Sequence, residues 1–127
     1  MAATIEFELV SPERLLLAKP VEMVVVPGSE GDFGVMAQHA PMIAAVRPGV
    51  IAIFQGGKVA ERIFVAGGVA EVTAERCTVL AERAVPVGDI DRAAVERKLA
   101  DDREDAAAAE VAIGEAMLAA LDRPAYH

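Results

Sequence analysis

The stretch Val26-Pro27-Gly28-Ser29-Glu30-Gly31-Asp32-Phe33-Gly34-Val35 decides the expected architecture of this chain. It holds three glycines at a spacing of three, one proline and two carboxylates between two apolar runs. Glycine enters positive φ without steric cost, and proline pre-sets φ for a tight turn. The stretch therefore predicts a compact acidic loop over residues 27–32, which joins a strand ending at Val26 to a strand starting at Phe33. This loop presents Glu30 and Asp32 to solvent on a rigid base.

Apolar runs on both sides of this loop predict further strands. Ile5, Phe7 and Leu9 alternate with polar residues, and a period of two indicates a half-buried strand over residues 4–10. Seven further apolar runs follow, and the last is expected to close the series of strands. Pro20 is expected to separate the first two of them. The runs cover residues 14–18, 21–26, 42–46, 50–54, 59–66, 69–73 and 77–82. Short strands at this spacing, with turn residues between them, are typical of a β-sandwich or barrel.

The pattern changes at Gly88 and indicates helix beyond it. Residues 89–121 contain one glycine, no proline and no period of two. Asp89 or Asp91 can cap a first helix by accepting backbone N–H bonds, and Asp105 is a suitable cap for a second helix. Pro124 is expected to end the second helix.

Two arrangements of residues 89–121 are open on the sequence alone. The first is an antiparallel helical hairpin with its bend in the charged run 101–105. It buries Val95 and Leu99 against a second apolar stripe, with Ile113 and Met117 beside that stripe. The second stripe consists of Val111, Gly114, Leu118 and Leu121. The second is one continuous helix, because nothing between Asp101 and Ala106 forbids helical backbone angles. Two separate stripes favour the hairpin. The expected organisation is a β-domain over 1–87 and a helical hairpin over 88–127.

Composition excludes several classes of protein. The net charge is −8, whereas phosphate binding relies on Lys and Arg, so nucleic acid is not an expected partner. The first residues lack the basic start and apolar core of a signal peptide, and no apolar run approaches the ~20 residues that would span a bilayer. One cysteine, Cys77, excludes an internal disulfide and fits a reducing compartment. Its apolar neighbours predict a small buried side chain rather than a nucleophile.

No arrangement of residues predicts an active site. His39 and His127 are the only histidines, and the spacing of His39 to Glu30 and Asp32 resembles no metal site. Gly28, Gly31 and Gly34 match neither a dinucleotide fingerprint nor a phosphate loop, so we interpret them as turn formers. The sequence therefore predicts no catalytic residue, no metal and no cofactor. The acidic loop is either a contact surface or a solvated turn.

Several of these motifs together resemble one known family, the ε subunit of the F-type ATP synthase (δ in mitochondria). The resemblance runs from the N-terminus to about Glu82 without gaps, and it is looser in the helical tail. It is found in these segments: Val21-Glu22, Gly28-Ser29-Glu30-Gly31-Asp32-Phe33-Gly34, His39-Ala40-Pro41, Pro48-Gly49 and Ala66-Gly67-Gly68-Val69-Ala70-Glu71-Val72.

The resemblance implies a fold, partners and a location. The fold would be a ten-stranded β-sandwich followed by two helices. The chain would be a non-catalytic part of the rotor, bound to the γ subunit and resting on the ring of c subunits, peripheral to the membrane and on its cytoplasmic face in bacteria. In this family the loop matching Glu30, Gly31, Asp32 and His39 faces the c-ring. Met42 and Val46 are our candidates for contact with γ.

The resemblance also implies a tail that in some members binds ATP and brakes hydrolysis by meeting the catalytic α and β subunits. The ATP-binding motif is degenerate here: Ile90 and Asp91 match, but Arg92 stands two residues early, about 200° around the helix. Residues 88–127 hold ten acids and five bases, a net charge of −5, and acidic partners would repel this tail. We therefore expect weak or absent ATP binding and a weak brake.

Two other classes of function remain as alternatives. A free-standing β-sandwich binding module would have no affinity for a γ subunit. A small hydrolase or isomerase would lose turnover on substitution of Glu30, Asp32 or His39.

Overall fold

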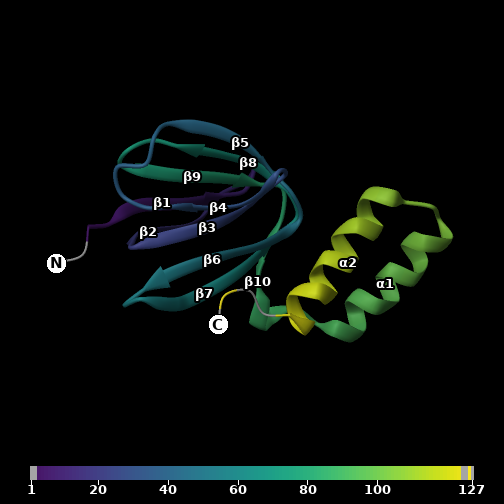
Figure 1. Ribbon diagram of the computed structural model, residues 1–127. Coiled ribbons are helices and arrows are strands. Elements are labelled where there is room, and N and C mark those ends of the chain that lie inside the picture. The colour runs from purple at the N-terminus through teal and green to yellow at the C-terminus, as the bar shows by residue number, and fades with distance from the viewer. Residues whose placement is uncertain (1–2, 124–125, 127) are drawn as a thin grey trace.

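The computed structural model describes residues 3–123 and 126 (Figure 1). Ten strands are followed by a short 3-10 helix and two α-helices. The strands are β1 Ile5–Val10, β2 Leu15–Val21, β3 Met23–Gly28, β4 Gly31–Val35, β5 Met42–Val46, β6 Gly49–Gln55, β7 Lys58–Val65, β8 Gly68–Val72, β9 Arg76–Ala81 and β10 Ala84–Pro86. The helices are η1 Val87–Asp89, α1 Arg92–Glu104 and α2 Ala108–Asp122. The expected mainly-β fold with a helical tail is confirmed.

The strands form one folded-over sheet in the order β10-β7-β6-β3-β5-β8-β9-β1-β2, with β4 paired to β3. All neighbours are antiparallel except β1 and β9, which run parallel. Strand β3 joins the two layers, because its first residues pair with β6 and Gly28 pairs with Val46 of β5. Figure 1 shows β6 and β7 lying opposite β5, β8 and β9.

The space between the layers is filled by aliphatic side chains. The predicted alternation in β1 is confirmed, because Ile5, Phe7 and Leu9 are 0–1% exposed. Cys77 is also fully buried in this core, as predicted. Burial raises the pKa of its thiol to about 12, so the thiol stays protonated at neutral pH.

Two strand boundaries differ from the sequence prediction. Pro20 does not end a strand: β2 continues through it to Val21. Strand β2 is the last strand of the sheet and pairs only with β1, and an edge strand tolerates a proline because one side of it needs no N–H donor. The series also does not close at residue 82, since the three residues of β10 pair with Ile63, Phe64 and Val65 of β7.

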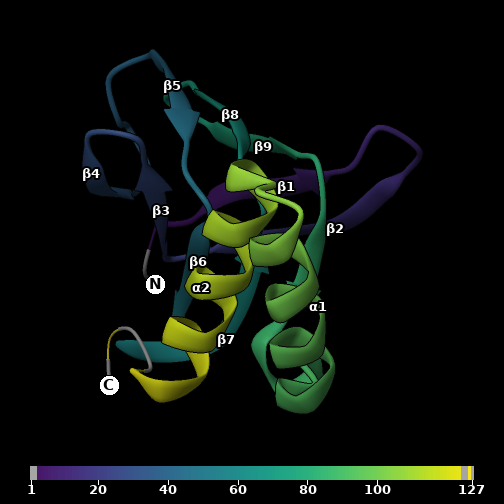
Figure 2. The same ribbon diagram turned by 90° about the vertical axis from the view of Figure 1, so that its right-hand side faces the viewer.

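The tail is folded as a hairpin, and its two helices lie side by side at one end of the sandwich (Figure 2). Asp91 caps α1, because its carboxylate accepts from the Ala94 N–H at 3.2 Å. Asp105 is not the cap of α2: it ends α1, and Ala107 precedes α2 without a side-chain cap. Ala106, at φ 56°, makes the reversal between the helices. The expected stop at Pro124 lies outside the described residues, and α2 ends at Asp122.

A second apolar cluster connects the helical hairpin to the sandwich. Ile113 and Ala120 of α2 pack in it with Phe64 of β7 and Ala66. Phe64 is 1% exposed and Ile113 is 8% exposed. Between the helices, Gly114 lies so close to Leu99 that an added Cβ would be 3.0 Å from its Cδ1. The hairpin is therefore held by apolar contacts on two sides.

Candidate partner-binding surface

The acidic stretch forms a tighter structure than the predicted loop over residues 27–32. Strand β3 continues to Gly28 and β4 starts at Gly31, so only Ser29 and Glu30 form the turn. Pro27 pairs with Asp32, and Gly28 pairs with Gly31. Backbone pairing therefore extends into the stretch that the sequence predicts as a loop. We call residues 27–32 the acidic hairpin.

Two glycines permit this turn for different reasons. A Cβ on Gly28 would lie 2.6 Å from the Gly31 carbonyl oxygen and 2.9 Å from the ring of Phe33. Gly31 has φ +134°, a conformation that L side chains rarely adopt. The turn is also anchored to β5, because the Ser29 N–H donates to the Ala45 carbonyl at 2.9 Å. Glu30 is thus held at an exposed tip on a fixed base.

The two carboxylates of the acidic hairpin have different surroundings. Glu30 is exposed, whereas Asp32 accepts from the Arg47 guanidinium at 2.6 Å and from the Tyr126 hydroxyl at 2.5 Å. Arg47 also donates to the Gly28 carbonyl at 2.6 Å. Partial burial works to raise the pKa of Asp32, but the hydrogen bonds from Tyr126 and Arg47 prevail and lower it. Asp32 therefore already has partners within the chain.

His39 is not brought together with Glu30 and Asp32. It follows the opposite end of β4, in a loop that the Gln38 N–H fastens to the Ala74 carbonyl at 2.8 Å. Its Nδ1 lies 2.7 Å from the Ala40 carbonyl oxygen. In the described part of the chain, no three His, Cys, Asp or Glu side chains are grouped so that they could hold a metal ion.

The two candidates for γ contact have unequal exposure. Val46 is 6% exposed and belongs to the core, so its side chain is not available to a partner. Met42 is partly exposed and lines a groove of about 340 Å³ between β5 and the acidic hairpin, together with Glu30 and Gly31. The exposed large apolar side chain of β5 is Ile43, at 73%. The alternation of β5 explains the error, because Val46 has the inward parity and Ile43 and Ala45 the outward parity.

A row of apolar residues crosses the outer face of five strands. Ala45 of β5 is paired with Val69 of β8, Val69 with Leu80 of β9, Leu80 with Val10 of β1 and Val10 with Leu15 of β2. Val69, Leu80 and Leu15 are 46%, 48% and 55% exposed. We call these five residues the apolar row. Sequence reasoning missed it because the row exists only once distant strands are paired.

Residues of the degenerate ATP motif have structural partners in the folded tail. Ile90 packs against the cluster between the helices and the sandwich. Asp91 is the α1 cap, and Arg92 donates to the Asp122 carboxylate at the end of α2 at 2.5 Å. At the opposite end of α2, the Glu110 carboxylate accepts from both Arg83 and Lys98, and so ties α2 to the sandwich and to α1.

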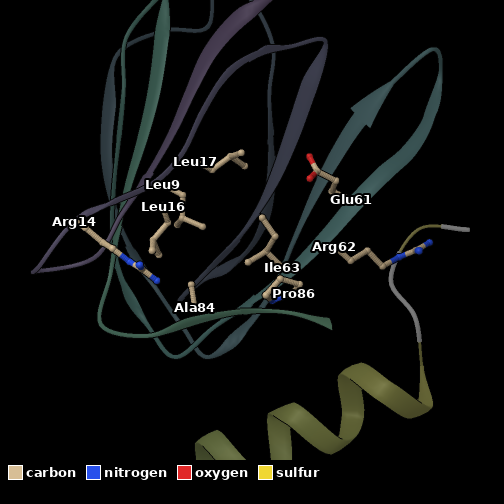
Figure 3. A pocket seen from close by; sticks show the side chains of 9 residues that line it. All are labelled: Leu9, Arg14, Leu16, Leu17, Glu61, Arg62, Ile63, Ala84 and Pro86. Atoms are coloured by element: carbon tan, nitrogen blue, oxygen red, sulfur yellow. The ribbon is translucent and has the colours of Figure 1, made fainter. Parts of the chain in front are cut away.

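A cavity of about 530 Å³ lies where β2 faces β7 and β10 (Figure 3). Its wall includes Leu9, Leu16 and Ile63, and Arg62 extends away from it toward the C-terminal segment. Nothing in this wall resembles a nucleophile paired with a base. Among the described residues, no helix has the length and apolarity needed to cross a membrane.

Comparison with known proteins agrees with this fold. The family model for the β-sandwich domain of the ATP synthase delta/epsilon chain matches residues 4–87. This chain belongs to the ATP synthase delta/epsilon family. It is 59% identical over 131 residues to the ATP synthase epsilon chain of Rhodospirillum rubrum, covering 94% of this chain and 98% of the relative. It is 66% identical over 90 residues to the ATP synthase epsilon chain of Paramagnetospirillum magneticum, covering 71% of this chain and 68% of the relative.

A solved structure extends the likeness into the tail. A chain of the mitochondrial ATP synthase of Euglena gracilis, in a complex described as OSCP, F1 and c-ring, matches with a TM-score of 0.81 at 25% identity. The match covers 94% of this chain and 82% of that chain. The family resemblance inferred from the sequence is therefore confirmed, and with it the membership of this chain in a rotary ATP synthase.

Proposed function

We propose that this chain is a non-catalytic rotor subunit, peripheral to the membrane and on its cytoplasmic face in bacteria, which couples the γ subunit to the c-ring. The observation that carries the proposal is the apolar row, together with the acidic hairpin at its end. Ala45 of the row accepts the hydrogen bond from Ser29 of the turn, so the two features adjoin. A chain with two adjoining contact features can bind two partners at once.

We assign the γ contact to the outer face of β5, β8, β9, β1 and β2. Three apolar side chains near half exposure, aligned by strand pairing, are more than scattered surface hydrophobes. Ile43 extends the face beyond the row, and the Arg76–Glu8 ion pair, at 2.7 Å, lies farther along it. This face replaces Val46 as the candidate and leaves Met42 beside it, in the groove.

We assign the c-ring contact to the tip of the acidic hairpin. Glu30 is the exposed carboxylate there, and Gly31 shapes the turn that presents it. A single exposed ion pair contributes only about 0–1 kcal/mol, so the contact needs several groups and a fitted shape. Asp32 is part of this assignment at the base of the hairpin, where Arg47 holds it. His39 lies beyond the opposite end of β4 and is a separate candidate for c-ring contact on its own loop.

We assign the sandwich, residues 1–87, to torque transfer and the tail, residues 88–127, to a weak regulatory role. The tail is acidic, and Asp91 and Arg92 are engaged in a helix cap and an ion pair. We therefore expect weak or absent ATP binding and a poor brake on hydrolysis. A saturable, tight ATP isotherm with the isolated protein would contradict this part.

Binding to an isolated γ subunit tests the γ assignment. Leu80→Glu places a charge in the middle of the apolar row and should weaken binding at least tenfold. Ala93→Glu is the matched control, because it adds the same charge at an exposed position in the first turn of α1, where an acid is favoured. Equal binding of both variants would refute the γ face. No binding by the unsubstituted chain would favour the free-standing binding module instead.

Hydrolysis and synthesis by the reconstituted ATP synthase test the division of labour. The full chain is compared with a chain stopped after Gly88. We expect similar hydrolysis rates and preserved proton coupling. A several-fold faster hydrolysis without the tail would show that the tail is a brake and that the charge argument fails.

A further inference from the structure

The chain's single tyrosine returns from the end of α2 to the sandwich and contacts three strands. Its hydroxyl donates to the Asp32 carboxylate of β4 at 2.5 Å. Its ring lies edge-on to Phe54 of β6, with ring centroids 6.0 Å apart. Its carbonyl accepts from the Arg62 guanidinium of β7 at 2.8 Å. Tyr126 is thus fastened by three independent kinds of contact.

These contacts share one carboxylate with the acidic hairpin. Asp32 holds Arg47 on one oxygen, Oδ1, and Tyr126 on the other, Oδ2. The charged groups in direct contact with Tyr126 and Asp32 are Arg47, from the β5–β6 connection, and Arg62, from β7. Arg123, at the end of α2, lines the same small pocket as Asp32 and Arg47. The end of the tail and the base of the acidic hairpin therefore form one electrostatic cluster.

We propose that Tyr126 is a latch that holds the C-terminal end of the helical hairpin on the sandwich, and that a cationic group of a partner binding Asp32 opens it. Opening of the latch by a partner rests on the proposed function, which makes the acidic hairpin a partner surface. The latch itself does not rest on the proposed function. Each Asp32 oxygen already accepts one bond, from the charged Arg47 guanidinium on Oδ1 and from the neutral Tyr126 hydroxyl on Oδ2. The neutral donor is the weaker of the two, so a partner cation that draws on this carboxylate competes with the tyrosine first. By linkage, closing the latch weakens the partner's hold on Asp32 by the same factor.

The latch acts beyond the last buried residue of α2. Ile113 and Ala120 pack against the sandwich and Asp122 pairs with Arg92 of α1, whereas Asp122 and Arg123 are themselves exposed. Residues beyond such an end fray unless they are tied down. The latch also leaves the hairpin folded when it opens, because the Leu99–Gly114 contact and the Phe64 cluster do not involve Tyr126. Opening therefore changes the helix end and not the fold.

The protein contains its own reporter for the latch. It has one tyrosine and no tryptophan, so absorbance of the phenolate reports Tyr126 alone. Burial of the hydroxyl and the hydrogen bond to Asp32 raise the pKa of Tyr126 to about 12. In the full chain we expect Asp32→Asn to return this pKa toward the ordinary value of about 10. Glu30→Gln, which removes the neighbouring charge, should leave it raised. A pKa near 10 in the unsubstituted chain would overturn the latch.

Amide hydrogen exchange at neutral pH provides a second reading. Tyr126→Phe removes the hydroxyl and keeps the ring against Phe54. We expect several-fold faster exchange in the last turn of α2 in Tyr126→Phe and in Asp32→Asn, with no further increase in the double variant. Exchange near Leu99 should not change. Unchanged exchange at the helix end, or effects that add in the double variant, would overturn the latch.

The proposed opening of the latch by a partner is tested by the same exchange measurement in the assembled rotor. After assembly with γ and the c-ring, the last turn of α2 should exchange as fast as in Tyr126→Phe. An assembled chain whose helix end keeps its protection overturns the coupling alone. A chain that does not assemble overturns the proposed function and the coupling with it, while the two measurements on the isolated chain still decide the latch.

Discussion

Replacing Gly28 by alanine tests whether close backbone contact shapes the acidic hairpin. The new Cβ would lie 2.6 Å from the Gly31 carbonyl oxygen and 2.9 Å from Cε1 of Phe33. The carbonyl belongs to the residue paired with Gly28 in the ladder, so it moves only if the turn opens. Overpacking of this kind costs about 1–3 kcal/mol. A cost of 1 kcal/mol lowers Tm by about 4 °C in a domain of this size, so we expect a decrease of roughly 4–12 °C.

Thermal unfolding followed by circular dichroism measures this decrease. Gly88→Ala is the matched control, since Gly88 has no positive φ and nothing lies within 4 Å of an added Cβ. Its Tm should change by no more than about 2 °C. Gly31→Ala should also destabilise, by about 1–3 kcal/mol, but through the backbone strain at φ +134° rather than through contact. A Gly28→Ala variant as stable as Gly88→Ala would refute the steric account of this turn.

Three further predictions follow from burial and charge. Cys77, fully buried and with a pKa raised to about 12, should not react with a thiol reagent at pH 7 until the chain unfolds; a fast reaction in the folded protein would contradict its place in the core. Ile113→Ala should cost about 2–4 kcal/mol and speed exchange in α2 more than in the β1 core, whereas Ala112→Gly, at an exposed site on the same helix, should cost about 1 kcal/mol. The pKa of Asp32 is lowered in the folded state, so the contribution of its carboxylate to stability is present above pH 3.8, the ordinary pKa, and is lost as the pH falls through the folded pKa. Tyrosine fluorescence should therefore be constant from pH 7 to about 5 and change only in stronger acid.

Local rules predicted the parts of this fold that depend on nearby residues. Alternation predicts the buried face of β1, and the change of pattern at Gly88 predicts helix beyond it, where α1 and α2 lie. The sequence offers Asp89 or Asp91 as the cap before the first helical run, and it is the Asp91 carboxylate that accepts an N–H there. Each of these features is decided within a few residues. They were accessible because the physical cause lies in the same stretch of sequence.

Features that depend on pairing between distant strands were not accessible in the same way. The parallel pairing of β1 with β9 joins residues about seventy positions apart, as in Glu6 and Arg76. The three-residue strand β10 has no periodicity of its own and exists because β7 offers an edge. Pro20 is compatible with β2 only because β2 ends the sheet. Strand order decides all three, and no local pattern encodes strand order.

The candidate site shows the same division between local and distant causes. All five residues of β5 are apolar, so the strand's own sequence does not indicate whether Val46 faces the core or the surface. Pairing with Gly68 and Gly28 fixes Val46 inward and thereby turns Ile43 and Ala45 outward. The same pairing aligns Ala45 with Val69. The exposed apolar face is therefore a consequence of the topology, which is why it could be found only after the fold was known.

The surroundings of the Asp32 charge also depend on residues distant in the sequence. In the sequence it counts as one of two equivalent acids on a turn, and in the structure the two acids are not equivalent. Asp32 is the carboxylate of β4 whose side chain meets Arg47, 15 residues away, and Tyr126, 94 residues away. Its charge is therefore largely matched inside the chain, and the charge that the acidic hairpin offers to a partner is mainly that of Glu30. In the proposed latch, a partner cation that draws Asp32 away from the tyrosine also releases the end of the tail, so the affinity of this surface and the position of the tail's end form one equilibrium rather than two.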